Sequence, residues 1–456
     1  MKKTLLVLIV LIVIVALAFP ISNLLFKPAP MTKLSQRNDP SALYEKAAGV
    51  LESKCALCHA EGEQLPFYAN FPIAKGLIEA DIRKGLAWFD LQEIASAPEG
   101  APVPEPLLAK LEYALDHNTM PPGRFAALHW DAKLSGAEKE DLLAWVRDVR
   151  KSHYTTPGVA GEFEQEPVQP LPLEHGQNPE IVALGDKMFH DVRLSHDNSL
   201  SCASCHGLDK GGTDQKQFST GINGQVGDIN SPTVFNSAFQ FILFWDGRAP
   251  TLEAQADGPV NNAIEMGSNW NEAIPKLQAA TDVVEAFKKS FPDGLTSENV
   301  MKAIATFERS LNTPSRFDKY LSGDKSALTE EEQRGYQLFK EHACATCHSG
   351  KILGGQSFER MGINADYFVD RGDVIKRDYG RFNHTSNEKD RFKFKVPTLR
   401  NIEKTGPYFH DGTVTDLLEA VKTMGKYQSP TPLTDSEAEL IVKFLLSLTG
   451  EYAGKS

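Results

Sequence analysis

Cys202-Ala-Ser-Cys205-His206 stands near the middle of the chain, and its pattern occurs twice more. The other copies are Cys55-Ala-Leu-Cys58-His59 and Cys344-Ala-Thr-Cys347-His348, so the three copies contain all six cysteines. C-x-x-C-H is the attachment motif of c-type haem, in which both thiols bond to the porphyrin and the histidine binds the iron. A zinc site would need four converging ligands, and a redox dithiol needs no following histidine. The sequence therefore predicts three covalent c-type haems with three proximal ligands, His59, His206 and His348.

The composition is that of a chain able to bury a core. Hydrophobic residues make up 41% and charged residues 24% of the 456 positions. The net charge of -12 argues against a nucleic-acid partner, because such partners require a basic surface.

The first residues predict export. Lys2 and Lys3 precede an apolar run over 5–19, and hydrophobicity resumes over 21–26. We interpret residues 1–27 as a transmembrane anchor with its N-terminus inside, since a span needs about 20 apolar residues. The alternative is a signal peptide cleaved after Ala16-Leu-Ala18. The predicted localisation is the inner membrane, with the haem domains in the periplasm.

The remainder divides into three haem domains and a linker. A mono-haem domain is predicted over 28–154, where Ser135-Gly-Ala-Glu138 is the capping box of an amphipathic helix. The proline-rich, acidic stretch 155–179 is predicted to be an extended, solvated linker. The second and third haem domains are predicted over 180–322 and 323–456.

These last two domains form an internal repeat. Pro232-Thr-Val-Phe-Asn236 matches Pro397-Thr-Leu-Arg-Asn401, and Trp245-Asp-Gly247 matches His410-Asp-Gly412 at the same separation. Gly185 and Gly335 occupy matching places before their haem motifs. The predicted fold is mostly α, with three cytochrome c-like haem domains, the last two in tandem, preceded by the transmembrane helix.

The ligand opposite each proximal histidine decides what the haem does, because an iron with an open face can bind peroxide. Met424, 14 residues after His410, is the candidate at the third haem. Met120, followed by two prolines, is the candidate at the first haem, with His117 and His129 as rivals.

At the second haem, the position matching Met424 is Pro259, which has no ligating atom. We therefore predict an open iron there, with Glu265 as a proton carrier unless it is an exposed surface acid. Met266, His190 and His196 are the residues that could still close that iron.

A family resemblance rests on the motifs of the tandem repeat. Residues 180–450 resemble the bacterial di-haem cytochrome c peroxidases. Residues 48–150 resemble a separate haem-binding domain, and anchor, extra haem and core together are similar to tri-haem, membrane-bound quinol peroxidases. The matching segments are Asn230–Asn236, Phe244–Arg248, Gln255–Pro259, Glu265–Met266, Pro397–Asn401 and Tyr408–Gly412.

The resemblance implies roles for particular residues. Glu265 would be the distal acid and base, Gln255 its hydrogen-bonding neighbour, and Trp245 would lie between the two core haems. Met424 would bind the electron-transfer haem. A structural calcium ion would be bound by oxygens of three residues, Asn230, Thr405 and Pro407.

One departure concerns resting access to the second haem. Many di-haem members carry a blocking histidine in the loop that here reads Ser219–Asp228, and this loop contains none. The predicted function is reduction of hydrogen peroxide at the second haem, with electrons relayed by the other haems from quinol or a small cytochrome. The alternatives are a non-enzymatic tri-haem electron-transfer cytochrome and a di-haem enzyme that oxidises a partner protein.

Overall fold

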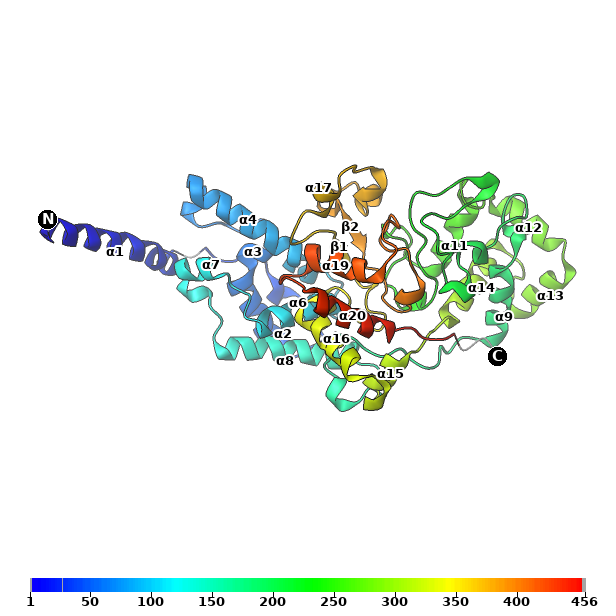
Figure 1. Ribbon diagram of the computed structural model, residues 1–456, viewed down its shortest axis with the longest axis horizontal. Coiled ribbons are helices and arrows are strands. Elements are labelled where there is room, and N and C mark those ends of the chain that lie inside the picture. Colours follow the sequence, from blue (N-terminus) through cyan, green and yellow to red (C-terminus); the bar gives the residue numbers. More distant parts are fainter. Residues whose placement is uncertain (1, 27, 453–456) are drawn as a thin grey trace. The chain divides into compact units, whose positions relative to one another are not determined.

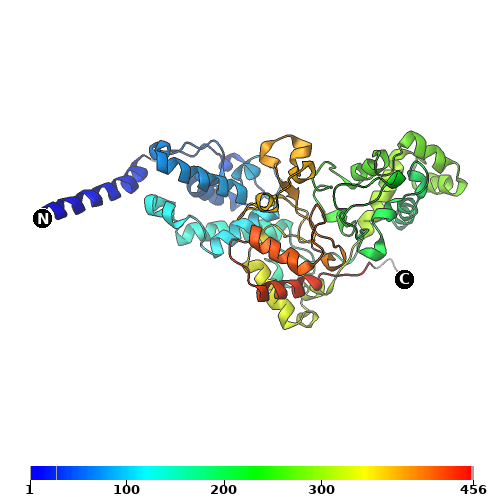
Figure 2. The ribbon, with the colours of Figure 1, turned by 45° about the horizontal axis from the view of Figure 1, so that its top comes forward.

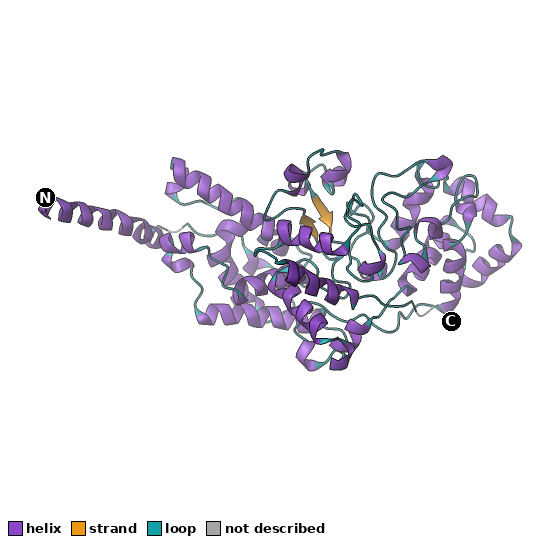
Figure 3. Cartoon of the chain, viewed as in Figure 1, coloured by secondary structure: helices purple, strands orange, loops and turns teal. Residues whose placement is uncertain are grey.

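The computed structural model describes residues 2–26 and 28–452, and helices dominate it (Figure 3). The chain forms two compact units, Met1–Thr155 and Thr156–Ser456. Among the described residues the only strands are β1 (Phe358–Arg360) and β2 (Lys393–Lys395), an antiparallel pair in the second unit.

The first unit has a helical core built around Trp145, which is fully buried with Leu142 and Val146. The predicted capping box is present: the Ser135 hydroxyl accepts from the Glu138 amide, and the Glu138 carboxylate accepts from the Ser135 amide. A π-helical turn, Leu51–Cys55, leads into the first haem motif. The helices of this unit are α1 (Lys2–Leu25), α2 (Tyr44–Val50), α3 (Ala56–His59), α4 (Pro72–Trp88), α5 (Leu91–Ala95), α6 (Glu105–Asp116), α7 (Gly123–Leu128) and α8 (Gly136–His153).

The transmembrane anchor predicted over 1–27 is not supported. Within 2–26 and 28–452, no helix has the length and apolar character that crossing a membrane requires. α1 contains Pro20, and its last turn is docked: Asn23 is 7% exposed and donates to the Leu128 carbonyl at 2.8 Å and the Tyr68 hydroxyl at 3.3 Å. The prediction of a single inner-membrane anchor is corrected with it. Met1 and Lys27 lie outside the described residues.

The second unit is built from two similar halves, each with a pair of packed helices. α9 packs on α14 in one half and α16 on α20 in the other, with α19 beside α20 in both views (Figures 1 and 2). A Cβ added at Gly185 or Gly335 would lie 2.0 Å from the Ala303 or Leu440 carbonyl oxygen, so both helix pairs require glycine at the crossing. The helices are α9 (Pro179–Phe189), α10 (Cys202–Cys205), α11 (Leu252–Asn261), α12 (Trp270–Gln278), α13 (Thr281–Ser290), α14 (Ser297–Ser310), α15 (Arg316–Leu321), α16 (Glu330–Glu341), α17 (Tyr367–Arg371), α18 (Phe382–Thr385), α19 (Leu417–Gln428) and α20 (Asp435–Leu446).

The repeat markers bind one another across the two halves. The Asn230 amide donates to the His410 carbonyl at 2.8 Å, and its repeat counterpart Lys395 donates to the Trp245 carbonyl at 2.8 Å. Trp245 and His410 are themselves counterparts, so the two bonds are related by the repeat. Both halves therefore use the same backbone geometry where they meet.

The segment after Thr155 is packed rather than solvated. Val168 is fully buried and Gln169 is 1% exposed, and the Leu171 amide donates to Asp318 at 2.7 Å. The prediction of a solvated linker is therefore wrong for 163–171. Phe163 and Val168 belong to the core around the third haem motif, so burial of these apolar side chains fixes the strand-like, proline-rich segment.

Candidate functional site

The three proximal histidines share one local geometry. Each Nδ1 lies within hydrogen-bond distance of a backbone carbonyl: Phe89 for His59 at 3.1 Å, Gly212 for His206 at 3.2 Å and Leu353 for His348 at 3.0 Å. A carbonyl only accepts, so Nδ1 carries the proton and Nε2 keeps a lone pair available to a metal. Burial lowers the pKa of all three imidazoles, which favours this neutral, ligating form.

The cysteines fit covalent haem attachment. None of the three pairs forms a disulfide in the described part of the chain. Burial raises the pKa of Cys55 and Cys344 to about 12 and that of Cys58 to about 11.

Glu265 lies in a turn beside the second haem motif. Its carboxylate accepts a hydrogen bond from the Asn262 side-chain amide at 2.9 Å. Burial raises the pKa of Glu265, and the Arg248 guanidinium opposes the rise without cancelling it. The Glu265 charge also contributes to the raised pKa of Cys205, after burial of that thiol, which places the acid close to the motif.

The loop 219–228 is hydrogen-bonded to the segment that carries Glu265. The Ile222 amide donates to the Glu265 carbonyl at 2.8 Å, and the Gln225 side chain donates to the Ala263 carbonyl at 3.1 Å. A Cβ added at Gly221 would lie 1.9 Å from the Ile264 carbonyl oxygen. The loop therefore fixes the position of the acid.

Trp245 lies where the two halves meet. Its indole N–H donates to the Asn230 carbonyl at 2.9 Å, and its ring is 6.5 Å from that of His410 in an edge-on arrangement. Gln255 is partly buried on α11, whereas the side chain that donates a hydrogen bond to the Glu265 carboxylate is Asn262.

The candidate methionines lie in different settings. Met424 is partly buried on α19, whereas Met120 is 41% exposed. Met266 is 5% exposed and packed in the core of the second-haem half.

The rival histidines all have other partners. The ring of His117 stacks on Tyr113 at 4.0 Å, and His129 bonds to the Tyr68 hydroxyl at 2.5 Å. His190 pairs with Asp186 at 3.0 Å and His196 with Glu272 at 2.9 Å. These contacts orient the four rings toward protein groups.

The residues expected to bind calcium are only partly brought together. Asn230 reaches the segment of Pro407 through its bond to the His410 carbonyl, and its side-chain NH₂ donates to the Lys216 carbonyl at 2.9 Å. The amide oxygen is then the atom that a hard cation would take. The Thr405 hydroxyl donates to the Ile402 carbonyl at 3.4 Å.

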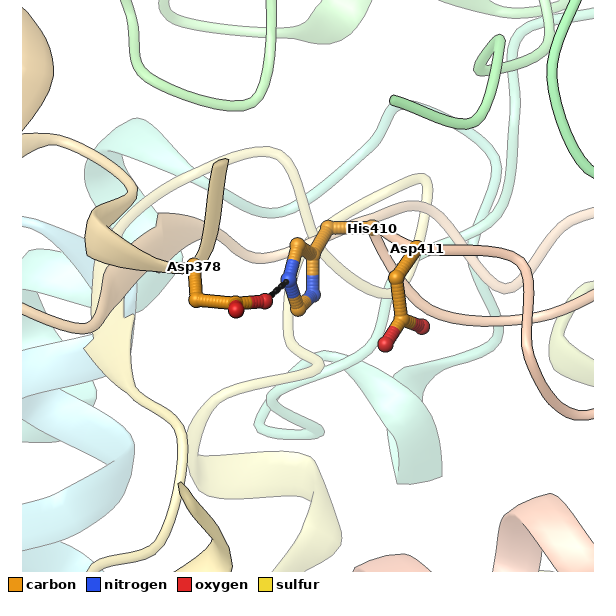
Figure 4. Close-up of side chains that lie close together, drawn as sticks. All are labelled: Asp378, His410 and Asp411. Carbon is orange, nitrogen blue, oxygen red and sulfur yellow. Dashed lines mark hydrogen bonds and ion pairs between the residues drawn. The ribbon is translucent and has the colours of Figure 1, made fainter. Parts of the chain in front are cut away.

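A buried charge network adjoins Trp245. Asp378 points at the His410 ring at 2.8 Å, with Asp411 nearby (Figure 4). Their three ligand atoms lie within 4.8 Å, the geometry of a metal site. Arg371, however, binds both carboxylates, at 2.9 Å to Asp378 and 2.8 Å to Asp411. Burial favours the protonated acid, but the bonds from His410 and Arg371 outweigh it and lower the pKa of Asp378, so this is an ion-pair network.

Comparison with known proteins places these motifs in families. Residues 179–326 match the model of the di-haem cytochrome c peroxidases, 12–148 a haem-binding domain and 332–449 cytochrome c. The chain is 45% identical to the cytochrome c peroxidase Ccp of Escherichia coli, over 89% of this chain and 88% of that one. It is also 45% identical to the cytochrome c551 peroxidase of Nitrosomonas europaea, over 63% of this chain and 85% of the relative.

Among solved structures, a MauG-like protein associated with microbial copper homeostasis superposes with a TM-score of 0.56 at 30% identity, covering 63% of this chain and 94% of that one. The similarity to the Escherichia coli protein covers 411 residues and therefore extends across both units. The chain belongs to the di-haem cytochrome c peroxidase family, and it is an oxidoreductase of the peroxidase type with covalent c-type haem.

Proposed function

We propose that the chain reduces hydrogen peroxide to water at the second haem motif, with Glu265 as the acid and base. The observation that carries this proposal is the environment of the Glu265 carboxylate. It is partly buried, its pKa is raised by burial, and it lies close enough to Cys205 to affect the pKa of that thiol. Perturbed carboxylates of this kind are typical of proton-transfer sites. The relatives named cytochrome c peroxidases support the substrate.

Haem held by Cys202, Cys205 and His206 supplies a redox-active iron with a position for peroxide. Glu265 takes a proton from one peroxide oxygen and returns it to the other, which leaves as water. The Asn262 amide holds one carboxylate oxygen in place, and the Arg248 charge favours the ionised form needed for the first transfer. Two electrons and two protons convert one peroxide into two waters.

The electrons come through the other two motifs, which makes three haems in all. Within the core, Trp245 lies on the electron path between the two halves that its contacts join. Gln255 acts as the neighbour of Glu265. His348 and Met424 bind the third haem, and a thioether ligand keeps such an iron readily reducible. The carbonyl of Trp245 accepts a hydrogen bond from the backbone amide of Lys395, on the strand whose continuation at Thr398 contacts the loop after the third motif.

His59 and Met120 would hold the first haem, which would supply the point of entry for electrons from a donor. The names of the relatives favour a small cytochrome, and a quinol is the second candidate. Asn230, Thr405 and Pro407 bind a calcium ion that holds the two halves of the core in register. Steady-state peroxide reduction with reduced cytochrome c, compared with a hydroquinone, identifies the donor.

The test of the proposal is Glu265→Gln, which keeps the shape of the side chain and removes its acid–base function. We expect full haem attachment and a loss of peroxide turnover of ~100- to 10,000-fold, because general acid–base groups contribute about that much. Glu285→Gln, an exposed change on α13, is the matched control and should retain wild-type turnover. Near-normal turnover in Glu265→Gln, with its haem content intact, would contradict the assigned role.

A further inference from the structure

Lys395 is a buried cation without a carboxylate partner. It is 5% exposed at the end of β2, and the polar partner of its ammonium group is the side-chain oxygen of Gln240, which carries no charge. Among the described residues no carboxylate lies within ion-pair distance of this ammonium. Burial alone lowers the pKa of Lys395 to about 7. A buried charge of this kind is costly unless an anion compensates it.

Other buried cations of the same unit show how such charges are compensated. Arg400 is fully buried and binds both carboxylate oxygens of Asp318, at 2.6 and 2.8 Å. Arg371 binds Asp378 and Asp411. By comparison, Lys395 lacks an anion supplied by the protein.

The position of Lys395 points to the third haem motif. The strand continues into Pro397 and Thr398, which pack on the loop after His348. The Thr398 hydroxyl donates to the Ile352 carbonyl at 2.7 Å, and a Cβ added at Gly354 would lie 2.1 Å from the Pro397 carbonyl oxygen. The neighbouring Leu353 carbonyl is the one that orients His348. Lys395 therefore lies on the segment that borders the third haem.

A second cation supports a negatively charged ligand at this place. Lys351, three residues after His348, is partly buried with a pKa lowered by burial, and its ammonium lies 5.8 Å from the centroid of the Phe239 ring, next to Gln240.

We propose that the ammonium group of Lys395 binds a propionate carboxylate of the haem attached at Cys344 and Cys347. Haem carries two such carboxylates, and it is the anion that the third motif itself brings into this part of the fold. The inference rests on the proposal that the third motif holds a haem. The ammonium group would compensate the negative charge of that propionate and so favour the reduced state of the haem.

The test is a potentiometric titration of the holoenzyme carrying Lys395→Met, with Lys395→Arg and the exposed Lys443→Met as controls. We expect Lys395→Met to lower the reduction potential of one haem and to shift a propionate bending band in the resonance Raman spectrum. Lys395→Arg should stay near the wild type because it keeps the charge, and Lys443→Met should change neither signal. An unchanged potential and Raman spectrum in Lys395→Met, at wild-type haem content, would overturn the proposal.

Haem content separates the possible failures. Pyridine haemochrome analysis of the wild-type protein counts the haems first, and a vacant third motif would refute the proposed function before any variant is measured. If Lys395→Met loses the third haem, Lys395→Arg decides. Retention of that haem in the arginine variant supports a requirement for charge, whereas its loss in both variants shows that only the size of lysine matters and overturns the proposal.

Discussion

At the scale of single residues, the ionisation of Glu265 sets the pH dependence of turnover. Its carboxylate must be ionised to accept a proton, and burial raises its pKa above the ordinary value of 4.5. The acid limb of the turnover profile should therefore lie above pH 4.5. Arg248 lowers this pKa, so Arg248→Met should raise it and move the acid limb to higher pH.

Methionine is the suitable replacement because the Arg248 guanidinium lies 3.6 Å from the Phe244 ring, a contact that an apolar chain preserves. The control is Arg334→Met on α16, whose guanidinium pairs with Glu341 at the surface. The measurement is the pH profile of peroxide turnover for the three proteins. An acid limb that stays in place or moves to lower pH in Arg248→Met would mean that Arg248 does not act on the general base.

A second residue-scale prediction concerns Met424. Met424→His should keep a six-coordinate third haem and lower its reduction potential, because imidazole stabilises ferric iron more than a thioether does. A redox titration of the oxidised and reduced spectra measures the change. Met301→Leu, a change of similar size on α14, should leave the titration as it is, and an unchanged titration in Met424→His would exclude Met424 as the ligand.

At the scale of elements, the repeat was predictable from the sequence and the contacts around Glu265 were not. The matched markers at Pro232 and Pro397 predict two similar halves, because identical turn residues require identical backbone paths. The hydrogen bond from Asn262 to Glu265 joins two polar residues of one turn, and no sequence pattern indicates that these two side chains meet. Arg248 lies in a recognised segment, but its effect on Glu265 is a through-space interaction that only the fold creates.

The loop 219–228 gives the element-scale prediction. Gly221→Ala places a Cβ about 1.9 Å from the Ile264 carbonyl oxygen, so the loop and the Glu265 segment must separate. We expect intact haem attachment, a stability loss of about 1–3 kcal/mol and a turnover loss on the order of 100-fold, since small displacements of catalytic groups have large effects.

Gly227→Ala in the same loop is the matched control, because its nearest neighbour would be 3.8 Å away. Steady-state turnover and thermal unfolding of both variants check the prediction. Equal turnover in the two variants would show that the loop does not position the acid.

At the scale of the whole molecule, the sequence placed the end of the first unit correctly but put the start of the second unit too late. Prolines and acids predict a solvated stretch over 155–179, yet Phe163 and Val168 pack in the core of the third-haem half and Leu171 is buried as well. Their partners lie far along the chain, so no local pattern shows that the stretch is needed there.

The position of this boundary can be tested by truncation. A chain beginning at Thr156 keeps the whole compact second unit, whereas one beginning at Glu180 loses the packed segment. The shorter chain lacks three buried side chains, Phe163, Val168 and Leu171, and the burial of each is worth about 1.5–3 kcal/mol. It also lacks Glu166, whose carboxylate accepts a hydrogen bond from Lys340 at 2.8 Å.

We therefore expect the chain from Thr156 to bind two haems and reduce peroxide with an artificial donor, and the chain from Glu180 to unfold at a clearly lower temperature. Calorimetry and haem content of the two proteins measure this difference, and equal unfolding temperatures would mean that the segment covers the core without stabilising it.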